Sequence, residues 1–125
     1  MKIRELMAQD KTTLSFEVFP PKKDTDFANV EKAAFGIAQL KPSYMSVTYG
    51  AGGSTKGHTI RLAGDIQKKF SVPTIAHLTC VCATKESIEQ ALSQMKEAGI
   101  ENILALRGDV PKDFEGNAFT DFTHA

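Results

Sequence analysis

A strand-like run followed by a helix-like stretch recurs about every thirty residues, and this repeat constrains the fold of the chain more than any other feature. The runs are rich in β-branched and aromatic residues, and the stretches between them carry apolar residues at helical spacing. The runs cover residues 14–19, 44–50, 74–81 and 102–107, and the helical stretches lie at 24–40, at 58–69 and between Thr84 and Gly99. Units of this kind connect parallel strands, so the sequence predicts an α/β fold with a parallel sheet.

Two architectures are built from such units, an open doubly wound sheet and a (β/α)₈ barrel. The strand-like runs are nearly continuous in apolar character, as expected for a sheet covered on both faces. Both architectures satisfy this pattern, so both stay open at this level.

Composition excludes several classes of function. The 125 residues suffice for one small domain, and fifteen acidic residues balance fifteen basic ones, so no excess charge favours nucleic acid or an anionic membrane. No apolar run approaches the roughly 20 residues of a membrane helix, and the mixed-charge N-terminus is unlike a secretory signal. The two cysteines, Cys80 and Cys82, are too few for a zinc site. We expect both to serve as small apolar side chains in a reducing compartment. These features predict a cytoplasmic protein without a bound metal.

Polar residues gather toward the ends of the strand-like runs. Because the carboxyl ends of parallel strands meet at one rim, where ligands bind in both architectures, these residues predict a site for an anionic ligand or for acid–base chemistry. They are Glu17, Thr48, Tyr49, His77, Thr79, Arg107 and Asp109.

Each of these residues also has a purely structural interpretation. Glu17 could form an ion pair with Arg107, and His77 could be a hydrogen-bonded core histidine. Thr48 and Thr79 are favourable strand residues whatever their function. The glycine-rich loop after the second run could be a tight turn or a phosphate cradle, but it lacks the spacing of a dinucleotide fingerprint.

Four motifs in order, "SFEVFPP", "VTYGAGGST", "AHLTC" and "ALRGD", resemble the 5,10-methylenetetrahydrofolate reductase family from about Leu14 to the last residue. The resemblance implies that residues 1–125 are the first half of a (β/α)₈ TIM barrel, with four strands and three complete helices, in an FAD-binding catalytic domain. It implies reduction of 5,10-methylenetetrahydrofolate to 5-methyltetrahydrofolate with NADH or NADPH as reductant. Hydride passes first to the flavin and then to folate.

The resemblance also assigns roles to residues. Glu17 matches the general acid that opens the bridging ring of the folate, and an apolar environment would favour its protonated form. Asp109 matches a catalytic aspartate near the flavin and the folate. Thr48 matches a position near the nicotinamide. The positions that match the cofactor site are Thr48, Tyr49, Ala51, His77, Arg107, Gly108, Asp109 and Ala125.

The length raises a further question, because a (β/α)₈ barrel needs about 250 residues. We favour a truncated portion without activity of its own. The alternatives are a short protein whose copies pair into a barrel-like homo-oligomer and an open sheet that reuses the motifs. A non-catalytic half-barrel module that holds no flavin stays open as a function, as does an acid–base enzyme without flavin.

Overall fold

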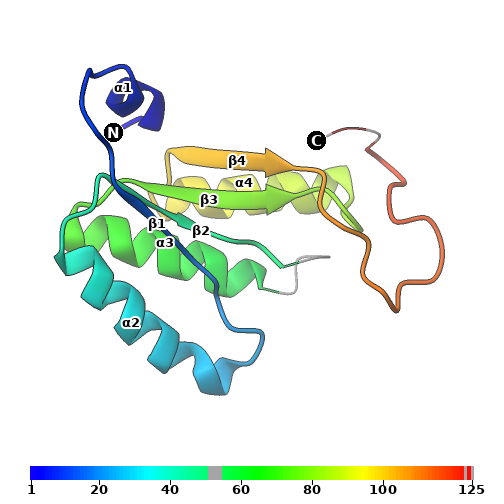
Figure 1. The fold of residues 1–125 in the computed structure, drawn as a ribbon. Helices are drawn as coiled ribbons and strands as arrows, with labels where there is room; N and C mark the ends of the chain where they lie inside the picture. The colour runs from blue at the N-terminus through cyan, green and yellow to red at the C-terminus, as the bar shows by residue number, and fades with distance from the viewer. Residues whose placement is uncertain (51–54, 123, 125) are drawn as a thin grey trace.

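The chain forms one sheet of four parallel strands in a computed structural model that describes residues 1–50, 55–122 and 124 (Figure 1). The strands stand in the sequential order β1-β2-β3-β4. Their bounds are Ser15–Val18 for β1, Tyr44–Val47 for β2, Thr74–Thr79 for β3 and Asn102–Leu106 for β4. A doubly wound sheet reverses its strand order partway, whereas a barrel adds each strand beside the last. The observed order selects the barrel-type alternative.

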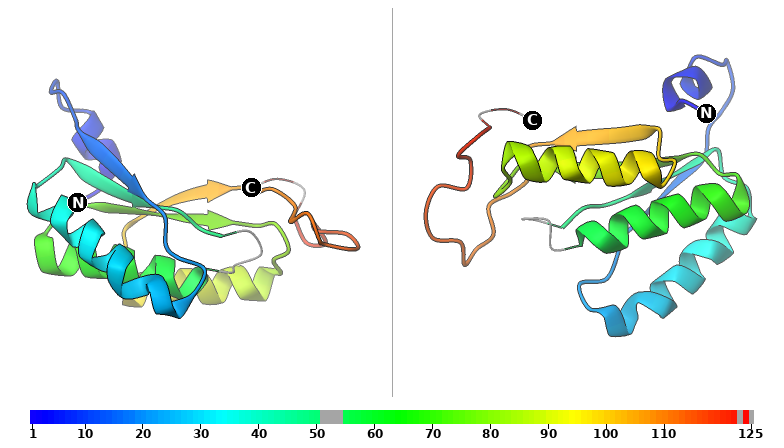
Figure 2. Two further views of the ribbon diagram at one scale, coloured as in Figure 1. Left: turned by 60° about the horizontal axis from the view of Figure 1, so that its bottom comes forward. Right: turned by 180° about the vertical axis from the view of Figure 1, so that it is seen from behind.

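The helices of the repeat all cover the same face of the sheet (Figure 2). They are α2 (Phe27–Gln39), which follows the short 3₁₀ helix η1 (Asp24–Asp26), α3 (Lys56–Phe70) and α4 (Lys85–Glu97). This layering confirms the expected first half of a (β/α)₈ barrel, with four strands and three repeat helices. Within the described ranges, no helix is long and apolar enough to cross a bilayer.

The core lies between the sheet and these helices. Val18, Val47 and Ala76 occupy paired positions on neighbouring strands, so their side chains share the helix-facing side of the sheet. All three are buried, and they pack in one cluster with residues of α3 such as Leu62 and Ile66. At the outer layer, the rings of Phe35 and Phe70 join α2 to α3, with their centroids 5.0 Å apart.

The opposite face of the sheet, which we call the open face, has no helix over it in the described residues (Figure 2). An open inner face is what the first half of a (β/α)₈ barrel leaves. On the edge strand β4 the side chains of both faces are exposed, with Leu104 at 43%, Leu106 at 37% and Ile103 at 39%. Apolar runs predict which strands form, but they do not show whether a neighbour covers each face.

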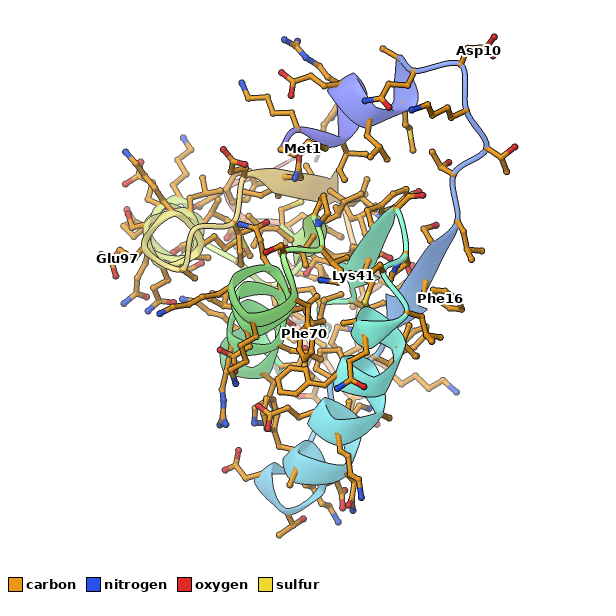
Figure 3. All side chains as sticks on the ribbon, turned by 90° about the vertical axis from the view of Figure 1, so that its left-hand side faces the viewer. Met1, Asp10, Phe16, Lys41, Phe70 and Glu97 are labelled. Atoms are coloured by element: carbon orange, nitrogen blue, oxygen red, sulfur yellow. The ribbon has the colours of Figure 1, made fainter. Side chains whose placement is uncertain are left out.

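A short helix, α1 (Ile3–Met7), precedes the repeat and was not expected from the sequence. It lies beside the amino ends of the strands, with Met1 next to β4 (Figure 3). Asn102 holds this segment: its Oδ1 accepts from the Ile3 amide at 2.9 Å, and its Nδ2 donates to the carbonyls of Met1 and Thr74. Five residues are too few to show a helical period, and the contacts that place them come from the far end of the chain.

Candidate active site

The carboxyl ends of all four strands point toward the same rim of the sheet (Figure 1). Backbone hydrogen bonds continue past the strands and tie the rim segments together. The Thr48 amide donates to the Val18 carbonyl at 3.0 Å, and the Val81 amide donates to the Arg107 carbonyl at 2.9 Å. These bonds join the segment after β2 to the end of β1, and the segment after β3 to the segment after β4.

Glu17 lies in β1 on the open face and contacts two side chains from neighbouring strands. Its pairing partner in β2 is Ser46, whose hydroxyl donates to Glu17 Oε2 at 3.0 Å. His77 of β3 places its Nε2 3.4 Å from the same oxygen, close enough for an ion pair when the imidazole is protonated. Three adjacent strands thus bring a carboxyl, a hydroxyl and an imidazole together.

The expectation that apolar neighbours bury Glu17 is wrong in this structure. The Glu17 side chain is 46% exposed, whereas that of His77 is only 10% exposed. The reason is the two-residue alternation of a strand: Val18 points to the helices, so Glu17 points to the open face. The apolar residues beside Glu17 in the sequence lie on either side of it in the strand but do not enclose it.

Arg107 follows β4 and lies against an aromatic ring. Its guanidinium carbon is 3.9 Å from the centroid of Phe119, a cation–π contact. The alternative ion pair between Arg107 and Glu17 is therefore wrong. Arg107 is exposed and forms no salt bridge within the described part of the chain. Sequence reasoning missed Phe119, because nothing in the local pattern connects it to Arg107.

The segment that carries Phe119 packs onto the start of α4. The Cys82 amide donates to the Ala118 carbonyl at 2.7 Å, and the Lys85 amide donates to Asp121 Oδ2 at 3.0 Å. A carboxylate at the amino end of a helix is favoured by the helix dipole. These contacts hold the segment after β4 beside the rim and fix the ring under Arg107.

Gly108 has a backbone reason to be glycine. Its φ is +81°, and a Cβ built on it would lie 2.6 Å from Val81 Cγ1 and 3.0 Å from Thr79 Cβ. Thr79 itself is buried, and its hydroxyl has no hydrogen-bond partner in the described residues. Thr79 packs beneath the "RGD" turn, where its Cβ and Cγ2 lie close to the position of an added Gly108 Cβ.

Tyr49 follows β2 and is partly buried. It lines, together with Thr79 and Ser87, a pocket of about 160 Å³ near the rim. Burial raises the pKa of the Tyr49 phenol above its ordinary value. The ring packs against the hydrophobic core cluster and is only partly buried. The larger groove of about 550 Å³ lies between α3 and α4, and none of the candidate site residues lines it.

His58, at the start of α3, ties down the chain that follows β1. Its Nδ1 lies 2.8 Å from the Pro21 carbonyl, and its Nε2 lies 2.7 Å from Asp24 Oδ1. The ring also packs on Phe27, with the centroids 4.9 Å apart. The proline turn that ends β1 is therefore anchored to α3, which stabilises the position of Glu17 four residues earlier.

Of the remaining predicted site residues, two are described by the structure and two are not. Thr48 is partly buried and Asp109 is exposed, each just beyond its strand on the rim. Ala51 and Ala125 lie outside the described residues.

The arrangement can hold an anionic, planar ligand and exchange a proton with it. Arg107 offers N–H donors that match phosphate oxygens, and its ring contact orients them. The carboxyl of Glu17 is open to the same face and can act on a ligand placed there.

A sequential parallel sheet, helices on one face and polar groups at the carboxyl rim define a chain of the (β/α)₈ enzyme class. A family model described as methylenetetrahydrofolate reductase matches residues 2–125. The chain belongs to the methylenetetrahydrofolate reductase family.

Curated relatives agree with this assignment. The chain is 41% identical over 110 residues to a probable methylenetetrahydrofolate reductase (NADH) of Oryza sativa subsp. japonica, covering 88% of the chain and 18% of the relative. It is 42% identical over 106 residues to the 5,10-methylenetetrahydrofolate reductase of Buchnera aphidicola subsp. Schizaphis graminum, covering 82% and 35%. For that of Pectobacterium carotovorum subsp. carotovorum the identity is 32% over 109 residues, covering 84% and 35%. The chain therefore spans about a third of the bacterial relatives and about a fifth of the plant one.

Proposed function

We propose that this chain contributes the first four strands of a catalytic site that reduces 5,10-methylenetetrahydrofolate to 5-methyltetrahydrofolate with FAD and NADH or NADPH. The observation that carries the proposal is the position of Glu17 on the open face, with Ser46 and His77 at its Oε2. Family membership and the names of the relatives support the substrate. One-carbon metabolism and methionine synthesis in the cytoplasm are the expected setting.

Glu17 is proposed as the general acid. It donates a proton to a nitrogen of the folate's bridging ring, the ring opens, and the carbon left as an iminium becomes electrophilic. Its exposure on the open face gives a folate direct access to the carboxyl. A positioned acid of this kind contributes about 10²- to 10⁴-fold to a rate.

The cofactor would be held by the residues of the rim. The bound flavin supplies the hydride chemistry, which belongs to the cofactor itself. Arg107, seated on Phe119, would bind its phosphates or a polar ring edge, and the Gly108 turn would present backbone groups beside it. Tyr49 and His77 would line the ring site, and Thr48 would lie near the nicotinamide. These assignments, with Ala51 and Ala125, are proposals.

Asp109 would act through its charge. It is exposed at the end of the rim motif, so its carboxylate can face both the cofactor and the folate. A negative charge there disfavours additional negative charge on its neighbours. Asp109 would thus favour transfer of hydride from the reduced cofactor to the folate. Its carboxylate would also contact the pterin ring of the folate.

A Glu17→Gln variant, expressed from the complete natural reading frame, tests the assignment. We expect it to keep flavin reduction by the nicotinamide and to lose folate reduction, measured as separate single-turnover reactions. Glu31→Gln is the matched control, because Glu31 forms a surface pair with Arg61 on the helical layer and should leave both reactions unchanged.

The competing function is a half-barrel module that holds no flavin. A preparation that shows no visible flavin absorbance, and gains none when FAD is titrated in, would favour that module. A Glu17→Gln variant that reduced folate at the unmodified rate would refute Glu17 as the acid.

A further inference from the structure

Ser46 is the neighbour that the sequence motifs did not single out. Glu17 and Ser46 are paired positions in β1 and β2, one repeat apart, and the Ser46 hydroxyl donates to Glu17 Oε2 at 3.0 Å. His77 Nε2 approaches the same oxygen at 3.4 Å. In the described residues, every polar contact of Glu17 is made through Oε2, and Oε1 has none.

This asymmetry distinguishes the two oxygens of one carboxyl group. A protonated carboxyl carries its proton on one oxygen, and the other keeps its acceptor lone pairs. An oxygen that already accepts from a hydroxyl, and lies beside an imidazole nitrogen, is stabilised as the acceptor. A proton on this carboxyl would therefore sit on Oε1, the oxygen that makes no polar contact within the described residues.

We infer that Ser46 is a positioning residue that holds the carboxyl of Glu17 by Oε2, so that Oε1 carries and delivers the proton. The inference rests on the proposed role of Glu17 as general acid. It adds the residue that orients the acid and the oxygen that reacts.

The physical need for such a residue follows from the exposure of Glu17. The side chain is 46% exposed, so packing alone does not restrict its three side-chain torsions. Ordering a free glutamate side chain costs rotamer entropy at each turnover, whereas a hydrogen bond already made in the resting protein meets this cost in advance. The Ser46 hydroxyl is a suitable donor for this purpose, because strand β2 already fixes its position.

The experiment compares Ser46→Ala with Ser46→Thr in the flavin-loaded protein from the complete natural reading frame. Threonine keeps the hydroxyl and favours a strand. Ser15→Ala is the matched control: Ser15 lies on the same face of β1, two residues before Glu17, and makes no side-chain hydrogen bond in the described residues.

We expect Ser46→Ala to lower the single-turnover rate of folate reduction about tenfold, the loss that corresponds to one hydrogen bond. Flavin reduction by the nicotinamide should stay unchanged. Ser46→Thr should restore most of the rate, and Ser15→Ala should match the unmodified protein in both reactions.

A second readout does not depend on activity. The carboxyl carbon of Glu17, labelled with ¹³C-glutamate and assigned by its absence in Glu17→Gln, reports on the hydrogen bond through its chemical shift. It should move in Ser46→Ala and return in Ser46→Thr.

The outcomes separate the inference from the proposed function. If the unmodified protein does not reduce folate, the proposed function fails, and the carboxyl resonance then decides whether Ser46 holds Glu17. A resonance that stays in place in Ser46→Ala overturns the inference. A Ser46→Ala rate equal to that of the unmodified protein, or an equal loss in both reactions that threonine does not restore, overturns it as well.

Discussion

Replacement of Gly108 by alanine tests how the "RGD" turn packs. Gly108 has φ +81°, and an added Cβ would lie 2.6 Å from Val81 Cγ1 and 3.0 Å from Thr79 Cβ. Gly99 is a matched position, because its φ is +79° but the nearest atom to an added Cβ is Gln67 Nε2 at 3.9 Å. The two variants share the backbone strain, and only Gly108→Ala adds a collision.

The magnitude follows from these two terms. A left-handed backbone costs a residue with a Cβ about 1–2 kcal/mol, which is the expected loss for Gly99→Ala. Overpacking adds about 1–3 kcal/mol, so Gly108→Ala should lose about 2–5 kcal/mol. The collision is difficult to relieve, because Val81 is almost fully buried and a β-branched side chain has few rotamers.

Urea unfolding of the two variants and the unmodified protein measures the difference in the free energy of unfolding. A Val81→Ala/Gly108→Ala double variant supplies the control. Removing Val81 Cγ1 makes room for the new Cβ at position 108, so the double variant should lose less stability than Val81→Ala and Gly108→Ala lose in total. Equal losses for Gly99→Ala and Gly108→Ala, within about 0.5 kcal/mol, would refute the packing argument.

Three further predictions concern the frame and the rim. Gly36→Ala, at an exposed position within α2 with nothing within 4 Å of the added Cβ, should raise the free energy of unfolding by about 0.5–1 kcal/mol in urea. Asn102→Leu removes the two hydrogen bonds that join Asn102 to the α1 segment, at Ile3 and Met1, so amide exchange of Ile3 should accelerate strongly while the β2 amides stay protected. Burial raises the pKa of Tyr49, so the folded state keeps its proton longer than the unfolded state. The contribution of Tyr49 to the free energy of unfolding is fully present below the ordinary pKa of 10.0 and is lost as pH rises through the folded pKa. Tyr49→Phe should remove this pH dependence from urea unfolding measured between about pH 9 and about pH 11.

Each of these has a clear contrary result. A loss of stability in Gly36→Ala would show that α2 packs against something at that position. Unchanged exchange at Ile3 in Asn102→Leu would show that α1 is held by other contacts. An identical fall in stability at high pH with and without Tyr49 would assign that fall to other groups.

The repeat and its element types could be predicted from the sequence with accuracy. The strand runs at 14–19 and 44–50 contain β1 and β2, and the stretch between Thr84 and Gly99 contains α4. These signals are local: β-branched runs, helical spacing and a left-handed glycine stop act within a few residues. Boundaries differ by a few residues, and the third strand ends at Thr79 rather than at 81 because the chain turns there, with Cys82 at φ 55°.

The candidate site could be predicted only in part. The position of Glu17, His77 and Arg107 near one rim followed from parallel strands. The partners did not: Glu17 contacts Ser46 and His77, and Arg107 lies on Phe119. The register of the sheet could have indicated Ser46, because a strand one repeat later lies alongside.

The amino-acid sequence by itself determined the elements, their order and the motifs that identify the family, because these depend on residues that are near one another in the chain. Tertiary structure alone decided that Glu17 is exposed, that Phe119 seats Arg107 and that Asn102 holds α1. The physical reason is that exposure and side-chain contact depend on which surfaces meet after the sheet has formed. Elements far apart in the chain supply those surfaces, and no local pattern records them.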